Sequence, residues 1–451
     1  MIGRCTLLGC LGLLFLSCTS QLNVYKNIDH AVQRNDFSKG LEEIIKGQER
    51  FPPIYSEKNA ISLYLDKGLM AHYAGEYLQS SLDLQEAERL IEEAYTKSVT
   101  ESISSYIIND NAKEYPGEDY EDIYLNVFNA LNYYNRGNLE GAMVEIRKIT
   151  IPNGKLDLLS RKYGKGLGTG DWVKQQLAGI GMIGTMNLEL PAGQAVTFSN
   201  SALARYLSFL FYLGAGTANE ARIEFEQVHT AYASNPKVYA NPIPGSIAES
   251  INIPDGKARI NVIAFVGLSP IKEEGLYNHI FPFFLNGELR WLIFKLPKFR
   301  KRESVINMIE VVVDGEERFY LELLEDIGAV VEETFNARFS NIYLKTFIRT
   351  LLKYAAADIA AAKLGENNSP GAAMLSATLA KAMIFASESA DTRMARYFPG
   401  KAYIGGINLE PGVYTVTINY YSNEKIITKD EHINFTVRPD ALNLIEAISL
   451  K

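Results

Sequence analysis

Cysteine, histidine and tryptophan are scarce in this chain of 451 residues, which contains 3, 5 and 2 of them. All three cysteines (Cys5, Cys10 and Cys18) lie close to the N-terminus, in a stretch that has the form of a cleaved leader. Without that stretch the chain keeps one thiol at most, which excludes disulfides, a cysteine nucleophile and cysteine-ligated zinc. The histidines are isolated in the sequence, with no His-Glu-x-x-His pair. We therefore expect no metal site, no cofactor and a fold stabilised by packing.

Positive charge is also in short supply, because 45 Lys and Arg stand against 53 Asp and Glu, for a formal net charge of -8. A basic surface that binds the phosphate backbone is not expected, so nucleic acid is not a predicted partner. The glycine run at 164–170 lacks the Lys-Ser/Thr ending of a phosphate-binding loop, and we expect a surface loop over 153–171. Adjacent carboxylates such as Glu332 and Glu333 are expected on solvated helix faces. The sequence has no Gly-x-Ser-x-Gly elbow either, and together these absences predict a protein that is not an enzyme.

Residues 1–17 have the parts of a secretory signal: a charged start at Arg4, an apolar run from Leu7 to Leu16 and a small residue at the end. Such a run spans roughly 15 Å as a helix, half of a bilayer core, so a membrane-spanning helix is not expected. Phe15-Leu16-Ser17-Cys18 resembles the lipobox of bacterial lipoproteins. We predict cleavage before Cys18 and a lipid on its sulfur; an ordinary secretory signal is the alternative.

Residues 18–238 are predicted to form a domain of repeated helix pairs. Small and aromatic residues recur at a spacing that resembles the tetratricopeptide repeat (TPR) in four units, at 36–52, 64–87, 124–149 and 202–236. Gly75, Gly137 and Gly216 are expected in the turns between paired helices, where a left-handed backbone can be required. The units are unevenly spaced, so the stack must be interrupted. An unrelated helical bundle is the alternative, because its apolar positions recur in a similar way.

Residues 239–451 are predicted to form a mostly antiparallel, sandwich-like β domain with an inserted helical hairpin at 329–390. Prolines from Pro236 to Pro244 indicate a linker before it. Asn286-Gly287 and Asp314-Gly315 each lie between apolar, β-branched runs and predict two hairpins. Further strands are expected at 258–267, 401–407, 413–421 and 432–437. The expected fold class is therefore a multidomain α+β protein.

The predicted helical hairpin and its C-terminal end carry four charged residues: Arg349, Lys353, Asp391 and Arg393. If the two helices pair, Arg349 and Lys353 face Asp391 and Arg393. We interpret the group as a structural ion cluster, with a ligand-facing cluster as the alternative.

Four pieces of the sequence together resemble a family of bacterial envelope lipoproteins of uncharacterised activity. They are the lipobox at Cys18, the helical unit at 124–148, the segment 343–353, and the segment 390–400 that leads to Leu409-Glu-Pro-Gly-Val-Tyr414. Phe398-Pro399 matches only approximately the Leu-Pro expected there. The resemblance covers nearly the whole chain, contains no catalytic motif and implies a role in the assembly of the cell envelope or cell wall.

The function expected from these features is a non-enzymatic, lipid-anchored scaffold that contacts other envelope proteins through a concave surface of the helical half. Its candidate contact residues are Tyr64, Tyr77, Tyr133 and Tyr212. Thr19 and Ser20 follow the anchor without an inner-membrane retention aspartate, so the outer membrane, facing the periplasm, is the expected location. A module that binds a glycan, peptide or lipid is the alternative. A hydrolase with its site between the two halves is a third reading, for which we find no converging acid and base.

Overall fold

The computed structural model describes residues 25–50, 54–99, 111, 113–164, 198–275, 281–285, 288–292, 295–367 and 389–451. The N-terminal part of the chain is helical and the C-terminal part consists mainly of antiparallel sheets, which confirms the predicted α+β class. Three predicted features lie outside the described residues: Cys18, residues 165–171 of the predicted loop and residues 368–388 of the helical hairpin.

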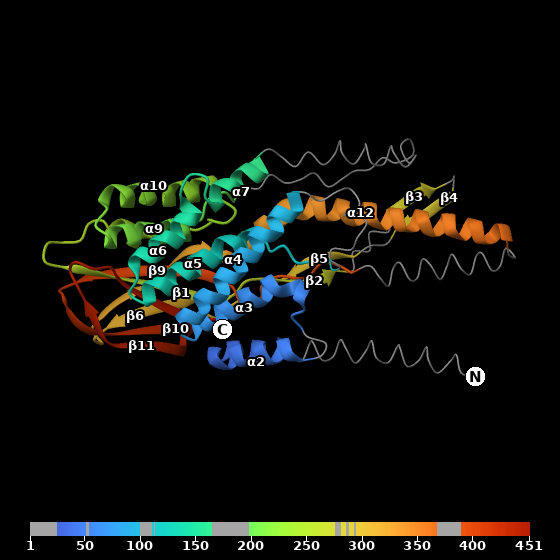
Figure 1. Cartoon of the computed structure of the whole chain (residues 1–451). Helices are drawn as coiled ribbons and strands as arrows, with labels where there is room; N and C mark the ends of the chain where they lie inside the picture. Colours follow the sequence, from blue (N-terminus) through green and yellow to red (C-terminus); the bar gives the residue numbers. More distant parts are fainter. Residues whose placement is uncertain are drawn as a thin grey trace.

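Four helix pairs make up most of the described N-terminal part (Figure 1). They are the helix over residues 25–33 with α2 (Phe37–Glu49), α3 (Ala60–Tyr73) with α4 (Tyr77–Val99), α5 (Asp119–Asn135) with α6 (Leu139–Thr150), and α9 (Ala202–Gly214) with α10 (Ala218–Ser234). A short 3-10 helix, η1 (Glu57–Asn59), precedes α3.

The turn inside each pair contains one residue with a left-handed backbone: Asn35, Gly75, Gly137 and Gly216, with φ of 56°, 77°, 75° and 72°. In the second turn the N–H of Gly75 donates to the carbonyl of His72, and the next N–H donates to the carbonyl of Ala71. The same two bonds recur in the other three turns. The predicted glycine turns are therefore confirmed, because glycine adopts this backbone without a Cβ penalty.

The second helix of one pair packs against the first helix of the next: α2 on α3, α4 on α5, and α6 on α9. An additional helix, α7 (Lys155–Gly164), follows α6 and packs on α5 and α6. The loop predicted over 153–171 is therefore wrong for residues 155–164. The Asp157 carboxylate accepts the N–H of Asn153 at 2.8 Å and satisfies a free backbone donor at the start of this helix.

Two four-stranded sheets follow. The first has the order β12-β1-β9-β8 and the second the order β11-β10-β6-β7. Their strands are β1 (Ala258–Leu268), β6 (Met308–Val313), β7 (Glu317–Tyr320), β8 (Glu322–Asp326), β9 (Pro399–Leu409), β10 (Gly412–Ser422), β11 (Lys425–Val437) and β12 (Asn443–Ser449). The β6–β7 hairpin turns at Asp314 and Gly315, both with positive φ, as predicted. The last strand, β12, was not predicted and pairs in parallel with β1.

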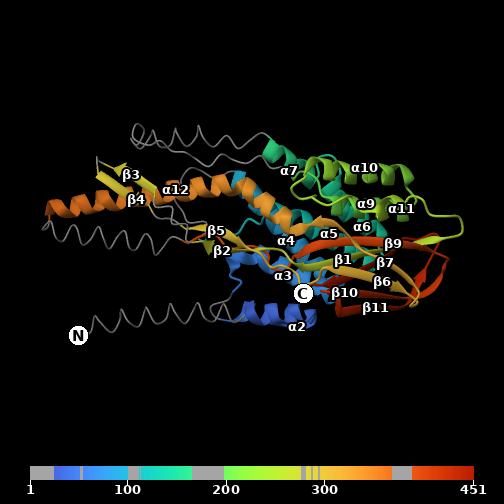
Figure 2. The ribbon, with the colours of Figure 1, turned by 180° about the vertical axis from the view of Figure 1, so that it is seen from behind.

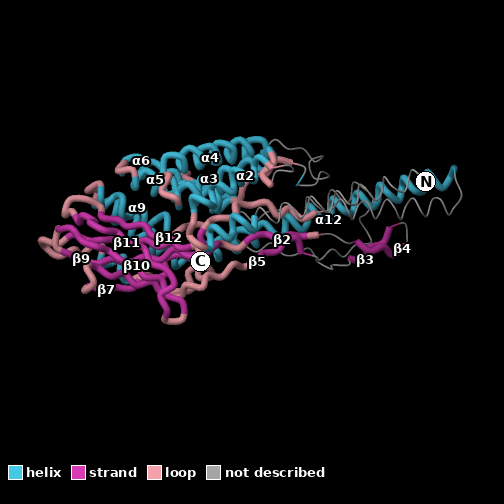
Figure 3. Tube along the Cα trace, turned by 90° about the horizontal axis from the view of Figure 1, so that it is seen from below, coloured by secondary structure: helices cyan, strands magenta, loops and turns pink. Residues whose placement is uncertain are grey.

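Two smaller strand pairs complete the described sheets. The predicted hairpin around Asn286-Gly287 is confirmed by the antiparallel pair β3 (Phe281–Leu285) and β4 (Glu288–Leu292). The pair β2 (Ile271–Gly275) and β5 (Leu296–Arg300) was not predicted. Figure 3 shows the two four-stranded sheets at one end of the molecule.

The first sheet is buried on both faces, between the helices and the second sheet (Figure 1). Along β1, Ile263 and Phe265 belong to the core shared with the helices, whereas Val262 and Ala264 belong to the core between the two sheets. This alternation follows from the two-residue period of a strand. The helical and β halves thus share one hydrophobic core.

The segment predicted as a linker, from Pro236 to Pro244, is packed against the body. Val238 and Tyr239 are both buried, and a short helix, α11 (Gly245–Glu249), follows. The prolines therefore end α10 and redirect the chain into β1, and they do not separate two independent cores.

The longest helix, α12 (Ile327–Asn367), has 41 residues and confirms the helix predicted at the start of the insertion. At 1.5 Å per residue it is about 60 Å long. Figure 2 shows it extending away from the two four-stranded sheets.

Candidate functional site

The four candidate contact tyrosines lie within the packing of the helix pairs. Tyr64, Tyr77 and Tyr133 are half-buried and Tyr212 is buried. The ammonium of Lys67 lies 5.4 Å from the Tyr64 ring centre, and the Arg147 guanidinium lies at the same distance from the Tyr212 ring. A partner surface centred on these tyrosines stays a prediction.

The first helices of the pairs face the chain's own β half. Phe128 of α5 packs against Phe265 of β1, with ring centres 5.0 Å apart, and against Phe398 at 6.2 Å. Tyr124, one turn earlier, also contacts Phe398. This face of the helices is therefore covered by the first sheet and by the extended segment 389–398.

Buried carboxylates hold segment 389–398 by its backbone. Glu121 of α5 accepts the N–H of Ala395 at 2.6 Å, and Asp66 of α3 accepts the N–H of Arg396 at 2.7 Å. The hydroxyl of Tyr73 donates to the carbonyl of Tyr397 at 2.9 Å. Burial raises the pKa of both carboxyl groups to about 7, although these donors oppose the shift.

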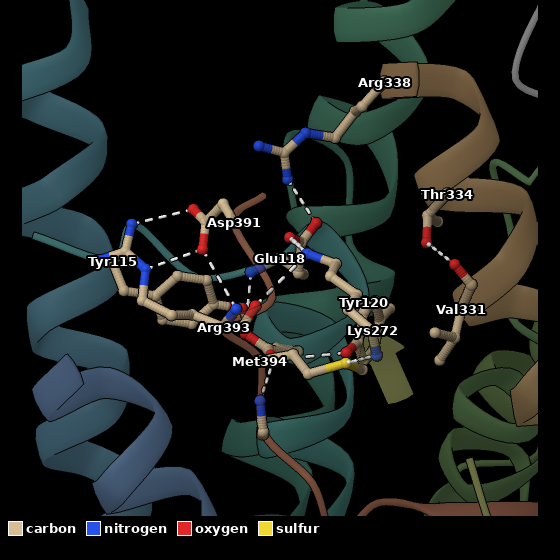
Figure 4. A network of polar contacts seen from close by, with 12 residues as sticks. Tyr115, Glu118, Tyr120, Lys272, Val331, Thr334, Arg338, Asp391, Arg393 and Met394 are labelled. Carbon is tan, nitrogen blue, oxygen red and sulfur yellow. Dashed lines mark hydrogen bonds and ion pairs between the residues drawn. The ribbon is translucent and has the colours of Figure 1, made fainter. Parts of the chain in front are cut away.

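A third buried carboxylate, Glu118, sits before α5 between two cations (Figure 4). It pairs with Lys272 of β2, and with the Arg338 guanidinium of α12 at 2.6 Å. Beside it, Arg393 pairs with Asp391 at 2.8 Å and lies over the ring of Tyr115.

The predicted ion cluster is therefore brought together in part. The structure joins Asp391 and Arg393, which lie on an extended segment directly after the predicted hairpin. Arg349 is buried on α12 and Lys353 lies one turn further along it. That these two residues face Asp391 stays a prediction.

Sequence reasoning missed Glu118, Lys272 and Arg338, because they come from three elements that are far apart in the chain. A signal existed for Asp66, which interrupts an apolar stretch of a helix that is buried on most sides. A charged residue in such a stretch needs a buried partner.

A fourth carboxylate, Glu325 of β8, joins the two halves. It is buried and accepts hydrogen bonds from the hydroxyls of Tyr124 and Tyr239, both at 2.5 Å. Ser201 Oγ, at 3.0 Å, and the N–H of Leu203, at 3.1 Å, donate to it at the N-terminus of α9. Every one of these carboxylates is occupied by protein donors, so the network can hold segments in place but offers no free acid or base.

The opposite, outward face of the helix pairs carries a repeated apolar position. Leu82 of α4, Val144 of α6 and Ile223 of α10 are each the seventh residue after the glycine of their turn. Their side chains are 54%, 50% and 50% exposed. We call these three residues the outer row.

A groove of about 600 Å³ adjoins the outer row at Ile223, between the end of α6, α7 and α10. Arg205 of α9 lies in it and donates to the Glu224 carboxylate at 3.1 Å and to the carbonyl of Thr150 at 2.8 Å. The remaining walls carry apolar groups such as Ile151, neutral polar groups such as Gln227 and the acidic residues Asp157 and Glu220. The outer row and this groove form the candidate functional site.

Comparison with known proteins finds no matching family model, no matching curated protein and no matching solved structure. Within the described residues, no helix combines the length and apolar character needed to cross a membrane. In the same part of the chain, His, Cys, Asp and Glu side chains nowhere gather in threes as metal ligands would.

Proposed function

We propose that this protein is a non-enzymatic, lipid-anchored scaffold of the bacterial cell envelope that binds a partner protein through the outer face of its helix pairs. The observation that carries the proposal is the outer row, in which Leu82, Val144 and Ile223 are half exposed at equivalent positions of three pairs. Stacked helix repeats present extended binding surfaces of this kind. Cys18 would carry the lipid and tether the body to the outer membrane, facing the periplasm.

Position in the fold supports this choice of face. Single exposed apolar residues are common on any protein surface, but here one position is apolar and exposed in three successive units. The first sheet covers the other face of the helices, so a partner can contact the helical half on its outward face. The occupied carboxylates Asp66, Glu118, Glu121 and Glu325 support a structural and not a catalytic role for the interior.

Crosslinking in intact cells, followed by identification of the captured protein, tests the proposal. Replacing Leu82, Val144 and Ile223 together by Asp is expected to reduce capture by about tenfold or more, because charges would be buried in the contact. The matched control replaces three exposed apolar residues of the second sheet by Asp: Val413, Ile426 and Ile433. The proposal fails if the outer-row variant captures its partner as the wild type does, or if the control loses it equally.

The anchor is tested separately. Cys18→Ser is expected to move the chain from the membrane fraction to the soluble fraction, and the mass of the N-terminal fragment should include a lipid on Cys18. A wild-type fragment without a lipid would contradict this part of the proposal and leave the partner experiment unaffected.

The groove favours one second candidate function, a module that binds a glycan, peptide or lipid. Its volume of about 600 Å³ is within the range of small-ligand sites. Asn200, Arg205 and Gln227 would supply the polar contacts. Thermal shift with glycan fragments, peptides and phospholipids tests it, and a response that survives Gln227→Leu and Asn200→Ala would place the ligand elsewhere.

A further inference from the structure

His72 of α3 is buried where the helices meet the last strand of the chain. Its Nδ1 lies 2.7 Å from Asn132 Oδ1 of α5, and its Nε2 lies 2.6 Å from Glu446 Oε1 of β12. The histidine side chain is 0% exposed and that of Glu446 is 6% exposed. Both ring nitrogens therefore face an oxygen and have no access to water.

A chain of hydrogen bonds fixes which atom of Asn132 faces the ring. The hydroxyl of Ser80 donates its single proton to the carbonyl of Gly68 at 2.7 Å. The same hydroxyl oxygen can then only accept, and its partner at 2.8 Å is Asn132 Nδ2. With the amide nitrogen directed at Ser80, Oδ1 faces His72 and requires a proton on Nδ1.

On the other side of the ring, Glu446 Oε1 requires a proton between itself and Nε2. Its second oxygen, Oε2, accepts from Asn135 Nδ2 at 2.7 Å. A neutral imidazole carries one N–H and can satisfy only one of its two oxygen neighbours. We propose that His72 and Glu446 together hold one additional proton, and that this proton fastens β12 to the helices as a pH-sensitive latch.

Among the described residues, Glu446 is the charged group that faces His72, and its charge determines how strongly the additional proton is held. From α4 the ring of Tyr77 meets the imidazole edge-on at 5.7 Å, and from α5 the ring of Phe128 does so at 5.1 Å. On α3 itself the hydroxyl of Tyr73 donates away from the site, to the carbonyl of Tyr397. The latch does not depend on the proposed scaffold function, because neither the outer row nor the groove takes part in it.

The direction of the pH dependence follows from this arrangement. Burial alone lowers the pKa of His72, but the Glu446 carboxylate and the two hydrogen bonds outweigh it and raise the pKa above its usual value. A histidine with a raised folded pKa gives its full stabilisation below the unfolded value of about 6.5, and that stabilisation is lost as the pH rises through the folded value. Deprotonation leaves one ring lone pair against an oxygen, so β12 loosens on the alkaline side.

The test uses the full-length chain labelled at histidine and followed by NMR through a pH titration. His30 and His229 are exposed and serve as internal references. His72 is expected to titrate above both. Across its titration step the hydrogen-exchange protection of β12 should fall by up to about tenfold per pH unit above 6.5, while that of α10 stays constant. His72 titrating with or below the references, or β12 protection unchanged across the step, would overturn the latch.

Two variants separate the latch from general effects. Glu446→Gln is expected to lower the pKa of His72 toward the references and to remove the pH step in β12 protection. His229→Gln, which removes an exposed histidine, should leave both unchanged. If the Glu446 variant does not fold, the wild-type titration decides by itself. A folded Glu446 variant that keeps the step would contradict the proposal.

Discussion

Asp66 of α3 accepts the backbone N–H of Arg396 at 2.7 Å, although 330 residues separate the two in the sequence. The other carboxylate oxygen accepts the hydroxyl of Tyr55 at 2.7 Å. The chain thus enters β9 along a path that is set by a helix near its other end. Non-local contacts of this kind form only after most of the chain is present, so we expect the helical half to gain its full stability late in folding.

The first prediction concerns Asp66 and pH. Burial raises the pKa of Asp66 to about 7, whereas an unfolded aspartate titrates near 3.9. Because the folded value is higher, the stabilisation from this proton is complete below about pH 4 and is lost as the pH rises to about 7. Burial also raises the pKa of Glu121, so its contribution to stability falls with rising pH in the same way. The unfolding free energy should therefore fall over this range, as denaturant unfolding at a series of pH values can measure.

Two substitutions isolate the contribution of Asp66. Asp66→Asn resembles the neutral acid and should flatten part of the pH dependence, while Asp66→Ala should cost about 1–3 kcal/mol because two buried donors lose their acceptor. Asp255→Asn, at an exposed site, is the matched control. If the unfolding free energy of Asp66→Asn falls with pH as steeply as that of the wild type, another group causes the pH dependence.

The second prediction concerns the buried pair of Lys272 and Glu118, whose side chains are 5% and 9% exposed. Lys272→Met removes one of two cations and should cost about 3 kcal/mol, since a buried charge loses a partner. Arg338 remains on Glu118 and limits the loss. Adding Glu118→Gln to Lys272→Met should recover part of the stability, as measured in a double-mutant cycle of thermal unfolding.

The control for this pair is Lys39→Met, which breaks an exposed i,i+3 pair with Glu42. Its thermal midpoint should stay at the wild-type value, because exposed pairs contribute little. If Lys272→Met and Lys39→Met lower the thermal midpoint equally, burial does not determine the strength of the Lys272–Glu118 pair.

Features carried by neighbouring residues could be predicted from the sequence. The helix pairs follow from local periodicity and from glycines such as Gly75, whose left-handed backbone is a local requirement. The hairpins follow from Asn-Gly and Asp-Gly turns. The helix α7 was missed because glycines dominate the residues that follow it, and they concealed ten residues of helical pattern.

Features that depend on distant partners could not be predicted. The strand β12 has no hairpin signal, because its partner β1 is parallel and far away in the sequence. The packing of the helices against the β half could not be predicted for the same reason: only the packed fold reveals that the first sheet covers one face of the helix pairs. The buried group around Glu118 combines Glu118 itself, which precedes α5, with Lys272 of β2 and Arg338 of α12. No spacing rule connects these three positions in the sequence.

The third prediction compares two glycines of the second helix pair. Gly75 has φ +77° and open space around a Cβ, so Gly75→Ala should cost about 1 kcal/mol from backbone strain alone. Gly75→Asn should cost less, because Asn35 adopts the same backbone in the first pair. Gly68 has an ordinary backbone, but a Cβ there would lie 2.7 Å from the Leu84 side chain.

Gly68→Ala should therefore cost about 1–3 kcal/mol through overpacking, and a smaller residue at Leu84 should relieve it. Denaturant unfolding of Gly68→Ala alone and with Leu84→Val checks this. The same Leu84→Val change should not rescue Gly75→Ala. Rescue of both, or of neither, would contradict the assignment of one glycine to packing and the other to backbone conformation.

The fourth prediction concerns Tyr239 and the junction at Glu325. Burial raises the pKa of Glu325, and the hydroxyl of Tyr239 is among the donors that oppose this shift. Tyr239→Phe keeps the ring but removes that donor, so it should cost about 1–3 kcal/mol when the carboxylate is ionised. The folded pKa of Glu325 then rises further, and the loss should be larger at pH 8 than at pH 5. Tyr414→Phe, which removes a hydroxyl bonded to the carbonyl of Glu410 near the surface, is the control and should show no such pH dependence. An equal loss at both pH values would mean that the Tyr239 hydroxyl acts by accepting the N–H of Ala202 at 2.9 Å, and not by donating to the carboxylate.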